Sequence, residues 1–244
     1  MADRFYTPQP LAPGDITLDG PEAHHLSTVR RFEPGDAVTL FNGDGREYAA
    51  EVVAVDRKRA TLHVREVLDI SRESPVNLTV ASALPKGDRA DYLVEKLTEL
   101  GVTHFIPLVT VRSVVVPKAT TVEKLARVVI EASKQCGRNR MMEIATPQKL
   151  SDFLAAPFSG ELSREDRRWL AHPSAPDARE LLAAISAGVT GRIALAVGPE
   201  GGFREAELAQ AITAGWQPVG LGPRILRIET AAIALAAAVM IHSK

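Results

Sequence analysis

The sequence is poor in the features that mark secreted, membrane-spanning and strongly basic proteins. Its one cysteine, Cys136, excludes an internal disulfide framework and is typical of a reducing compartment. The longest apolar run, Ala231–Ile241, is shorter than the roughly 20 residues that a helix needs to cross a bilayer. The formal net charge of −1 excludes a surface that coats nucleic acid through overall charge.

Signals for targeting and for metal binding are also scarce. The first ten residues, MADRFYTPQP, contain no apolar stretch of the kind found in secretory signal peptides, so we expect a cytoplasmic protein. His24 and His25 are adjacent, and no cysteine or further histidine stands at ligand spacing from them. The sequence therefore predicts no metal site.

The first seventy residues predict a small β domain. Turn signals at Asn42–Gly45 separate two apolar runs, and a third run alternates apolar and polar residues over 60–68. Several short strands with close turns are typical of a small barrel. Residues 22–31 have a helix-like pattern. Acidic residues outnumber basic ones in this part of the chain, so it cannot bind nucleic acid through bulk charge.

From the linker expected at residues 71–75 onward, strands and helices alternate. Apolar runs at 76–84 and 103–109 predict buried strands, and an apolar face over 88–100 predicts a helix. A capping box at Thr120–Glu123 is expected to open a helix that ends near Cys136. The alternation continues as strand, helix, strand and helix at 169–172, 178–187, 193–197 and 205–214. It indicates a mostly parallel sheet covered by helices.

Two glycine-rich loops near the C-terminus are the strongest candidate for a ligand site. Gly198–Gly202 follows one expected strand, and Gly222–Arg227 follows the apolar run Pro218–Leu221. Loops at the carboxyl ends of neighbouring strands form the usual ligand crevice of an open α/β sheet. The first loop lacks both the Lys-Ser/Thr ending of a phosphate loop and the GxGxxG spacing. Glu200 also places a negative charge where a pyrophosphate would bind, so neither ATP nor NAD is expected.

The two loops carry a resemblance to a known family. GPEGGF at 198–203 and LGPRILRIETA at 221–231 closely resemble the signature of the SPOUT methyltransferases, in particular the bacterial family that methylates N3 of a uridine in 16S ribosomal RNA of the small subunit. The resemblance spans nearly the whole chain and is most specific between Val197 and Ala232. It implies an α/β fold: a C-terminal SPOUT-type trefoil-knot domain with a mostly parallel sheet over 76–244, and a small PUA-like β-barrel over 1–70 that binds RNA.

The resemblance also implies S-adenosyl-L-methionine as the cofactor and a homodimer as the usual assembly. The cofactor would be held largely by main chain of the two glycine loops, with a third loop at His172. There Pro173-Ser174 stands where many members carry a glutamate, which weakens the match at this loop. The expected cofactor-binding residues are His172, Val197, Gly198, Pro199, Glu200, Gly201, Gly202, Leu221, Gly222, Ile225, Leu226 and Arg227.

Methylation of uridine N3 requires loss of the imide proton and in-line attack on an activated methyl carbon. Positioning and electrostatic stabilisation of the uridinate should therefore supply most of the catalysis. An arginine stays charged at any working pH and suits this task. The candidates are Arg224, Arg227 and Arg138. Glu229 could accept the proton or stabilise the first turn of the helix expected from that residue, and we favour the structural role. Glu200 is expected to face the cofactor cation or a neighbouring loop.

Local basic residues must supply any contact with RNA. The resemblance and the charge pattern point to Arg4, Arg30, Arg31, Lys86, Arg112 and Arg138, together with the turn Arg57–Arg59. The alternative is that these cations are solvated or favour the last turn of a helix.

Two other functions stay open. The chain could be a SPOUT enzyme with another RNA target, such as a ribose 2′-hydroxyl, or a non-enzymatic RNA-binding protein of ribosome assembly. The intact glycine loops favour an enzyme.

Overall fold

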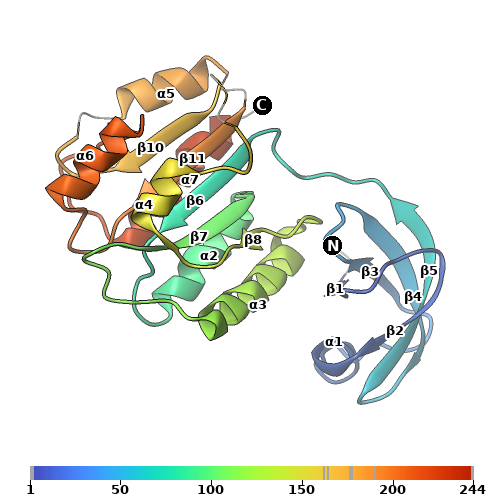
Figure 1. Ribbon diagram of the computed structural model, residues 1–244. Helices are drawn as coiled ribbons and strands as arrows, with labels where there is room; N and C mark the ends of the chain where they lie inside the picture. Colours follow the sequence, from blue (N-terminus) through green and yellow to red (C-terminus); the bar gives the residue numbers. More distant parts are fainter. Residues whose placement is uncertain (1–2, 162, 164, 176–177, 189–190, 243–244) are drawn as a thin grey trace. The chain divides into compact units, whose positions relative to one another are not determined.

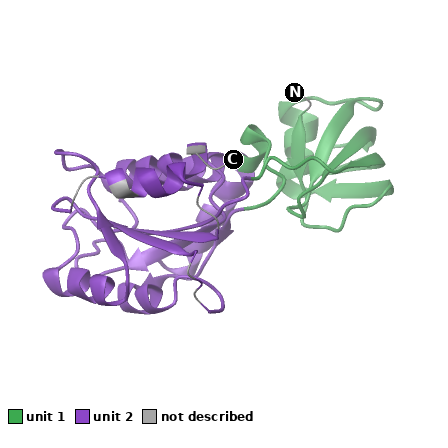
Figure 2. Ribbon diagram, turned by 90° about the horizontal axis from the view of Figure 1, so that it is seen from above, with its two compact units in different colours: residues 1–73, 133–141 green, residues 74–132, 142–244 purple. Residues whose placement is uncertain are grey.

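The computed structural model describes residues 3–161, 163, 165–175, 178–188 and 191–242, whose course is drawn in Figure 1. They form two compact units, coloured separately in Figure 2. The smaller unit comprises Met1–Glu73 and Ser133–Met141, and the larger comprises Ser74–Ala132 and Met142–Lys244. The sequence did not predict that residues 133–141 would join the N-terminal strands.

The smaller unit is built on a curled five-stranded sheet in the order β1-β3-β4-β5-β2. Its strands are β1 (Arg4–Tyr6), β2 (Gly14–Asp19), β3 (Ala37–Phe41), β4 (Glu47–Val55) and β5 (Arg59–Leu68). The strands predicted on both sides of the 42–45 turn and at 60–68 are confirmed as β3, β4 and β5. Alternate residues of these strands, such as Leu40, Tyr48 and Leu62, point into one apolar core.

The helix-like segment at 22–31 is less regular than predicted. Helix α1 (Gly20–His24) passes into a π-helical turn, His25–Val29, and Arg31 has a φ of 56°. Ala23 and Leu26 are its buried residues, so the segment covers one end of the sheet's core. A π-turn widens the helix by one residue per turn, which the spacing of apolar residues alone does not reveal.

A buried charge network centres on Glu47 in the smaller unit. Arg4 pairs with the Glu47 carboxylate at 2.5 Å and donates to the Arg138 carbonyl at 3.1 Å. Arg4 also donates to Asn139 Oδ1 at 2.6 Å. Arg72 pairs with the same carboxylate and donates to the carbonyl of residue 137 at 3.0 Å. The network thus fastens residues 137–139 to the N-terminal strands.

Arg138 adds a second buried ion pair to this unit. Its Nε and Nη2 atoms donate to the two carboxylate oxygens of Glu73 at 3.0 and 2.6 Å. Asn139 donates to the Ile70 carbonyl at 2.6 Å. Bidentate pairing of this kind fixes both direction and distance. Residues 137–139 are therefore held by specific contacts.

Glu47 should make the smaller unit sensitive to acid. Burial raises the pKa of the Glu47 carboxyl, but hydrogen bonds from Arg72 and Arg4 together outweigh burial and hold the pKa below its ordinary value of 4.5. A carboxyl whose pKa is lowered by folding contributes stability above its unfolded pKa and loses it as pH falls through the folded pKa. We expect Glu47→Gln to cost about 3 kcal/mol at pH 7 and to flatten the fall in Tm below about pH 4.5.

Thermal unfolding between pH 3 and 8 measures this effect, with exposed Glu66→Gln on β5 as the matched control. An acid profile of Glu47→Gln that parallels the wild-type profile would contradict the assignment.

The larger unit is a parallel sheet between two layers of helices. The strand order is β12-β10-β11-β6-β7-β8, and β9 pairs with β7. Every strand pair described in this sheet is parallel. The strands are β6 (Asn77–Ser82), β7 (His104–Val109), β8 (Glu143–Ile144), β9 (Gln148–Lys149), β10 (Arg167–Ala171), β11 (Arg192–Val197) and β12 (Gln217–Val219). The alternation of strands and helices predicted from the sequence is confirmed.

The helices cover both faces of this sheet. Helix α7 (Ile228–His242) packs on β11 and β6 and contacts α2 (Arg89–Glu99) and α5 (Arg179–Ser186). Helices α4 (Leu150–Ala155) and α6 (Glu205–Thr213) contribute to a core that includes Ala194 and Ala196 of β11. The last helix is apolar on most sides because the sheet and two helices surround it.

Two details of the helices differ from expectation. Helix α3 (Ala119–Cys136) begins before the capping box expected at Thr120–Glu123, and the Lys118 N–H donates to Thr121 Oγ1 at 3.2 Å. Glu123 is exposed. Helix α4 was not predicted, although Leu150, Phe153 and Leu154 have helical spacing and are buried.

Candidate active site

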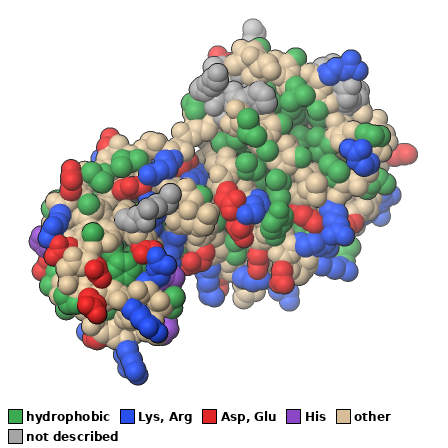
Figure 3. Space-filling model, turned by 180° about the vertical axis from the view of Figure 1, so that it is seen from behind, with side chains coloured by type: hydrophobic (Ala, Val, Ile, Leu, Met, Phe, Trp, Pro, Cys, Tyr) green, Lys and Arg blue, Asp and Glu red, His purple; other side chains and the backbone are tan. Residues whose placement is uncertain are grey.

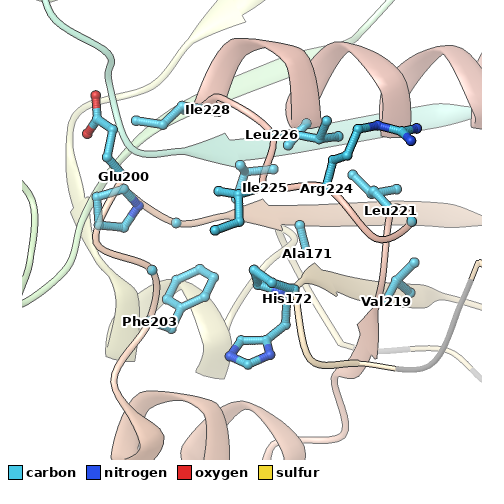
Figure 4. Close-up of a pocket in the computed structure, with 17 residues that line it drawn as sticks. Ala171, His172, Glu200, Phe203, Val219, Leu221, Arg224, Ile225, Leu226 and Ile228 are labelled. Atoms are coloured by element: carbon cyan, nitrogen blue, oxygen red, sulfur yellow. The ribbon is translucent and has the colours of Figure 1, made fainter.

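A cavity lies at the carboxyl ends of three adjacent strands, β12, β10 and β11 (Figure 4). Residues 197–200, 202 and 203 line it at the end of β11, residues 219, 221, 222, 224–226 and 228 after β12, and residues 171–173 at the end of β10. This is the edge of a parallel sheet where ligands bind in open α/β folds. The lining includes His172, Val197, Gly198, Pro199, Glu200, Gly202, Leu221, Gly222, Ile225 and Leu226, all expected cofactor-binding residues, and also Arg224. Gly201 and Arg227 are not among the lining residues.

The first loop is shaped by a glycine that lies on an aromatic ring. A Cβ atom on Gly198 would be 3.0 Å from the ring of Phe203, so a larger residue would displace one of them. Gly202 has a φ of 66°, and its N–H donates to the Pro199 carbonyl at 2.8 Å. Phe203 is buried in the core below the loop. The loop is therefore anchored from beneath, with its main chain close to the cavity.

The second and third loops meet across β10 and β12. The N–H of His172 donates to the Val219 carbonyl at 3.0 Å and so extends the pairing of these strands into the loops. Gly222 has a φ of 91°, a conformation that favours glycine, where the chain leaves β12. Ile225 is 86% exposed although it lines the cavity. An exposed apolar side chain at the cavity mouth is suited to contact with a ligand.

The charged side chains of the lining lie at its margins. In Figure 4 the head groups of Glu200 and Arg224 point away from the middle of the cavity, on opposite sides, while Ile225 and Leu226 lie between them. Glu200, which was expected to face the cofactor cation or a neighbouring loop, has its carboxylate 3.7 Å from Arg89 at the start of helix α2. The interior therefore offers apolar side chains and main-chain polar groups.

A fourth loop, which follows β7, is bound to the first loop. Arg112 Nη1 donates to the Gly201 carbonyl at 2.6 Å. The buried Glu207 carboxylate accepts the N–H of Val111 at 3.0 Å and the N–H of Arg204 at 2.7 Å. Glu207 thus joins the β7 loop to the start of α6. Sequence reasoning missed it, because Arg204 precedes α6 where a capping box needs Ser or Thr.

The structure corrects the roles expected of two arginines. Arg4 and Arg138 are only 8% and 4% exposed, and acidic side chains and carbonyls within the smaller unit bind their guanidiniums. Neither presents its charge to RNA. Arg138 is also no longer a candidate for catalysis, because Glu73 neutralises it.

The other basic candidates are mostly at the surface, where many have acidic neighbours. Arg30 pairs with Asp3, and Arg59 of the 57–59 turn lies 3.2 Å from Asp19. Arg31, Lys86 and Arg112 are exposed. On the face in Figure 3, acidic and basic side chains are interspersed on both units. Any electrostatic contact with RNA must therefore depend on a few residues.

The basic stretch from 118 to 140 is divided by the fold. Lys124 pairs with Asp91 at 2.7 Å within the larger unit, and Lys134 pairs with Glu22 at 2.8 Å within the smaller one.

In the part of the chain that the structure describes, no group of three or more His, Cys, Asp or Glu residues could hold a metal ion. No helix of these residues is long and apolar enough to cross a membrane.

Comparison with known proteins identifies the family. The model of an RNA methyltransferase domain matches residues 72–240, and that of an RNA methyltransferase PUA domain matches residues 18–65. The chain belongs to the RNA methyltransferase family. The first match covers the whole sheet of the larger unit and the cavity, and the second covers β3, β4 and most of β5 in the smaller unit.

Several relatives share one name. The ribosomal RNA small subunit methyltransferase E of Synechocystis is 33% identical over 229 residues, which cover 92% of this chain and 72% of the relative. That of Bacillus subtilis is 33% identical over 223 residues, covering 88% and 86%. A solved structure of the Neisseria gonorrhoeae enzyme bound to S-adenosyl methionine has a TM-score of 0.88 and 32% identity, covering 99% of this chain and 98% of that one.

Glu207 should be required for the order of the loops around the cavity. Glu207→Ala removes the acceptor of two loop N–H groups, and we expect a loss of about 2 kcal/mol in the free energy of unfolding. Urea unfolding measures the loss, and amide exchange at Val111 and Arg204 should accelerate. Glu205→Ala is the control, since Glu205 is exposed in the same helical turn. Equal effects of the two substitutions would contradict this role.

Proposed function

We propose that this protein uses S-adenosyl-L-methionine to methylate N3 of a uridine in 16S ribosomal RNA of the small subunit. The main support is the meeting of the two glycine loops at one cavity, inside the region matched by the RNA methyltransferase domain. The names of the relatives and the ligand of the Neisseria structure support the same substrate class and cofactor.

The residues around the cavity fit this cofactor. Apolar side chains such as Leu226 and Ile228 could pack on an adenine ring, and main-chain groups of both loops could bind its edge and the ribose. Because Gly198 has no Cβ atom, the main chain of the first loop can lie directly against the Phe203 ring. Glu200 is the one carboxylate among the described lining residues, and its head group points away from the middle of the cavity and lies beside Arg89. When bound, S-adenosylmethionine supplies an already activated methyl group.

The chain's own residues must bind the base and stabilise the charge that develops on it. Arg224 and Arg227 are exposed on the second loop, and a guanidinium near O2 or O4 would stabilise the uridinate. Glu229 is buried and lies 3.5 Å from Arg89, which supports the structural role that we favoured for it. The target uridine would have to leave its stack to reach the cavity.

Contacts with the rest of the RNA are proposed for exposed cations around the same sheet edge. Lys86 follows β6 and Arg112 follows β7, and both strands end at the edge where the cavity opens. Arg30 and Arg31 are the candidates in the smaller unit, whose PUA match supports an RNA-binding role. The loss of binding when salt is raised should be modest, because few phosphates would be neutralised.

The trefoil knot is proposed for the C-terminal part of the larger unit. Strand β12 lies outside β10, yet the chain then returns to place α7 on β11 and β6. Such a return is what threading of the last segment through an earlier loop would require. An experimental structure in which residues 192–242 can be traced would decide it.

We further propose a cytoplasmic homodimer. The exposed residues Tyr92, Leu182 and Ile241 lie on α2, α5 and α7, of which α2 and α5 each contact α7, and hydrophobic side chains gather on the larger unit in Figure 3. An apolar surface of this kind is typical of an interface. Light scattering should give twice the mass of one chain. The single-chain mass would reject the dimer.

Replacing arginines of the second loop should reduce turnover. We expect Arg227→Ala and Arg224→Ala each to lower kcat about 100-fold, because each substitution removes a guanidinium that would stabilise the negative charge developing on the uridine. Lys149→Ala, an exposed cation on β9, is the control and should retain full turnover. Turnover is measured with small subunits that lack the modification, and circular dichroism verifies the fold. Unchanged turnover in either arginine variant would reject the role of that residue.

The reaction itself is tested by methyl transfer from labelled S-adenosylmethionine to unmodified small subunits. After digestion of the RNA, mass spectrometry should find the label in 3-methyluridine. Label in a 2′-O-methylated nucleoside would instead indicate another RNA target. Absence of both label and cofactor binding would leave only the RNA-binding function.

A further inference from the structure

Arg89 does not line the cavity, but it lies between the elements that form the two sides of the cavity. It is the first residue of α2, after β6 and the turn at Gly87, where φ is 65°. Its Nη2 atom is 3.7 Å from Glu200 Oε1, and its Nη1 atom is 3.5 Å from Glu229 Oε1. One guanidinium therefore faces two carboxylates.

The two carboxylates belong to the two glycine loops or their immediate continuation. Glu200 stands in the first loop, and Glu229 is the second residue of α7, directly after the second loop. Helix α7 also meets α2 at its other end, where a Cβ on Gly101 would be 2.9 Å from Met240 Cε. Arg89 thus secures the end of the α2–α7 contact that is nearest to the cavity.

The contact with Glu229 should have the larger energetic effect. Glu229 is 6% exposed, and its Oε2 atom is buried without a hydrogen-bond partner, so its charge depends on Arg89. Breaking a buried ion pair by removing its cation is strongly destabilising, because the carboxylate is left uncompensated. The Glu200 side chain is 42% exposed, so its ion pair with Arg89 mainly orients the first loop. The next ion pair along α2, Asp91 with Lys124, does not involve Arg89.

We propose that Arg89 is a positioning residue that sets the spacing of the two cofactor loops by holding the start of α7 and Glu200 together. It acts through Glu200 and Glu229 and touches neither cofactor nor RNA. The proposal rests on the proposed function only in taking S-adenosylmethionine as the ligand. The spacing of the loops is a property of this chain alone.

The test is the affinity for S-adenosylmethionine, measured by calorimetry at pH 8. Arg89→Met should raise Kd about tenfold, because the Glu229 carboxylate loses its cation and the two loops lose their common contact. The double variant Arg89→Met/Glu229→Gln should recover most of the affinity, because no buried charge is left unpaired. Lys96→Met is the control: it removes another cation of α2, which pairs with Glu95 and Glu99, and should leave Kd unchanged.

A wild-type Kd for Arg89→Met would overturn the proposal, and so would a double variant no better than the single one. If the wild-type protein itself binds no S-adenosylmethionine, the proposed function fails and the loops are measured directly. Amide exchange of residues 198–203 and 221–228 should then be faster in Arg89→Met than in wild type and slow again in the double variant. Equal exchange in all three proteins would overturn the positioning role.

Discussion

The parallel pairing of β10 with β11 on one side and β12 on the other is the constraint on which the site depends. The register places Leu170 beside Ala196 and Ala171 beside Val219, so the three strands end at nearly the same level. The chain therefore leaves all three strands at the same edge of the sheet, and the three loops that follow form the walls of one cavity. The order of strands in space, and not their order in sequence, brings the loops together.

The packing around these strands keeps the loops in place. Phe203 fills the core below the first loop, Glu207 ties the loop after β7 to α6, and α7 lies against the sheet directly after the second loop. The cavity is consequently a continuation of the core, with apolar side chains inside and charges at its margins. In the smaller unit, buried arginines that resemble RNA contacts in the sequence instead hold its parts together.

Local signals predicted the strands, the turn at 42–45 and the two glycine loops, because hydrophobic periodicity and glycine act over a few residues. The family follows from the motifs at 198–203 and 221–231. The partners of Arg4 and Arg138 could not be predicted, since Glu47 and Glu73 lie 43 and 65 residues away and nothing local marks such pairs. The same limit applies to Glu207, whose N–H partner at Val111 is 96 residues distant. Helix α4, by contrast, has a local signal, because its buried residues Leu150, Phe153 and Leu154 have helical spacing.

If the loops after β10, β11 and β12 form one cofactor site, S-adenosylmethionine should protect all three together. Hydrogen exchange followed by mass spectrometry, with and without saturating S-adenosylmethionine, measures this protection. We expect slower exchange together in residues 171–173, 197–203 and 219–228, with strands β3 to β5 of the smaller unit unaffected. Protection confined to the smaller unit, or protection of only one of the three loops, would contradict it.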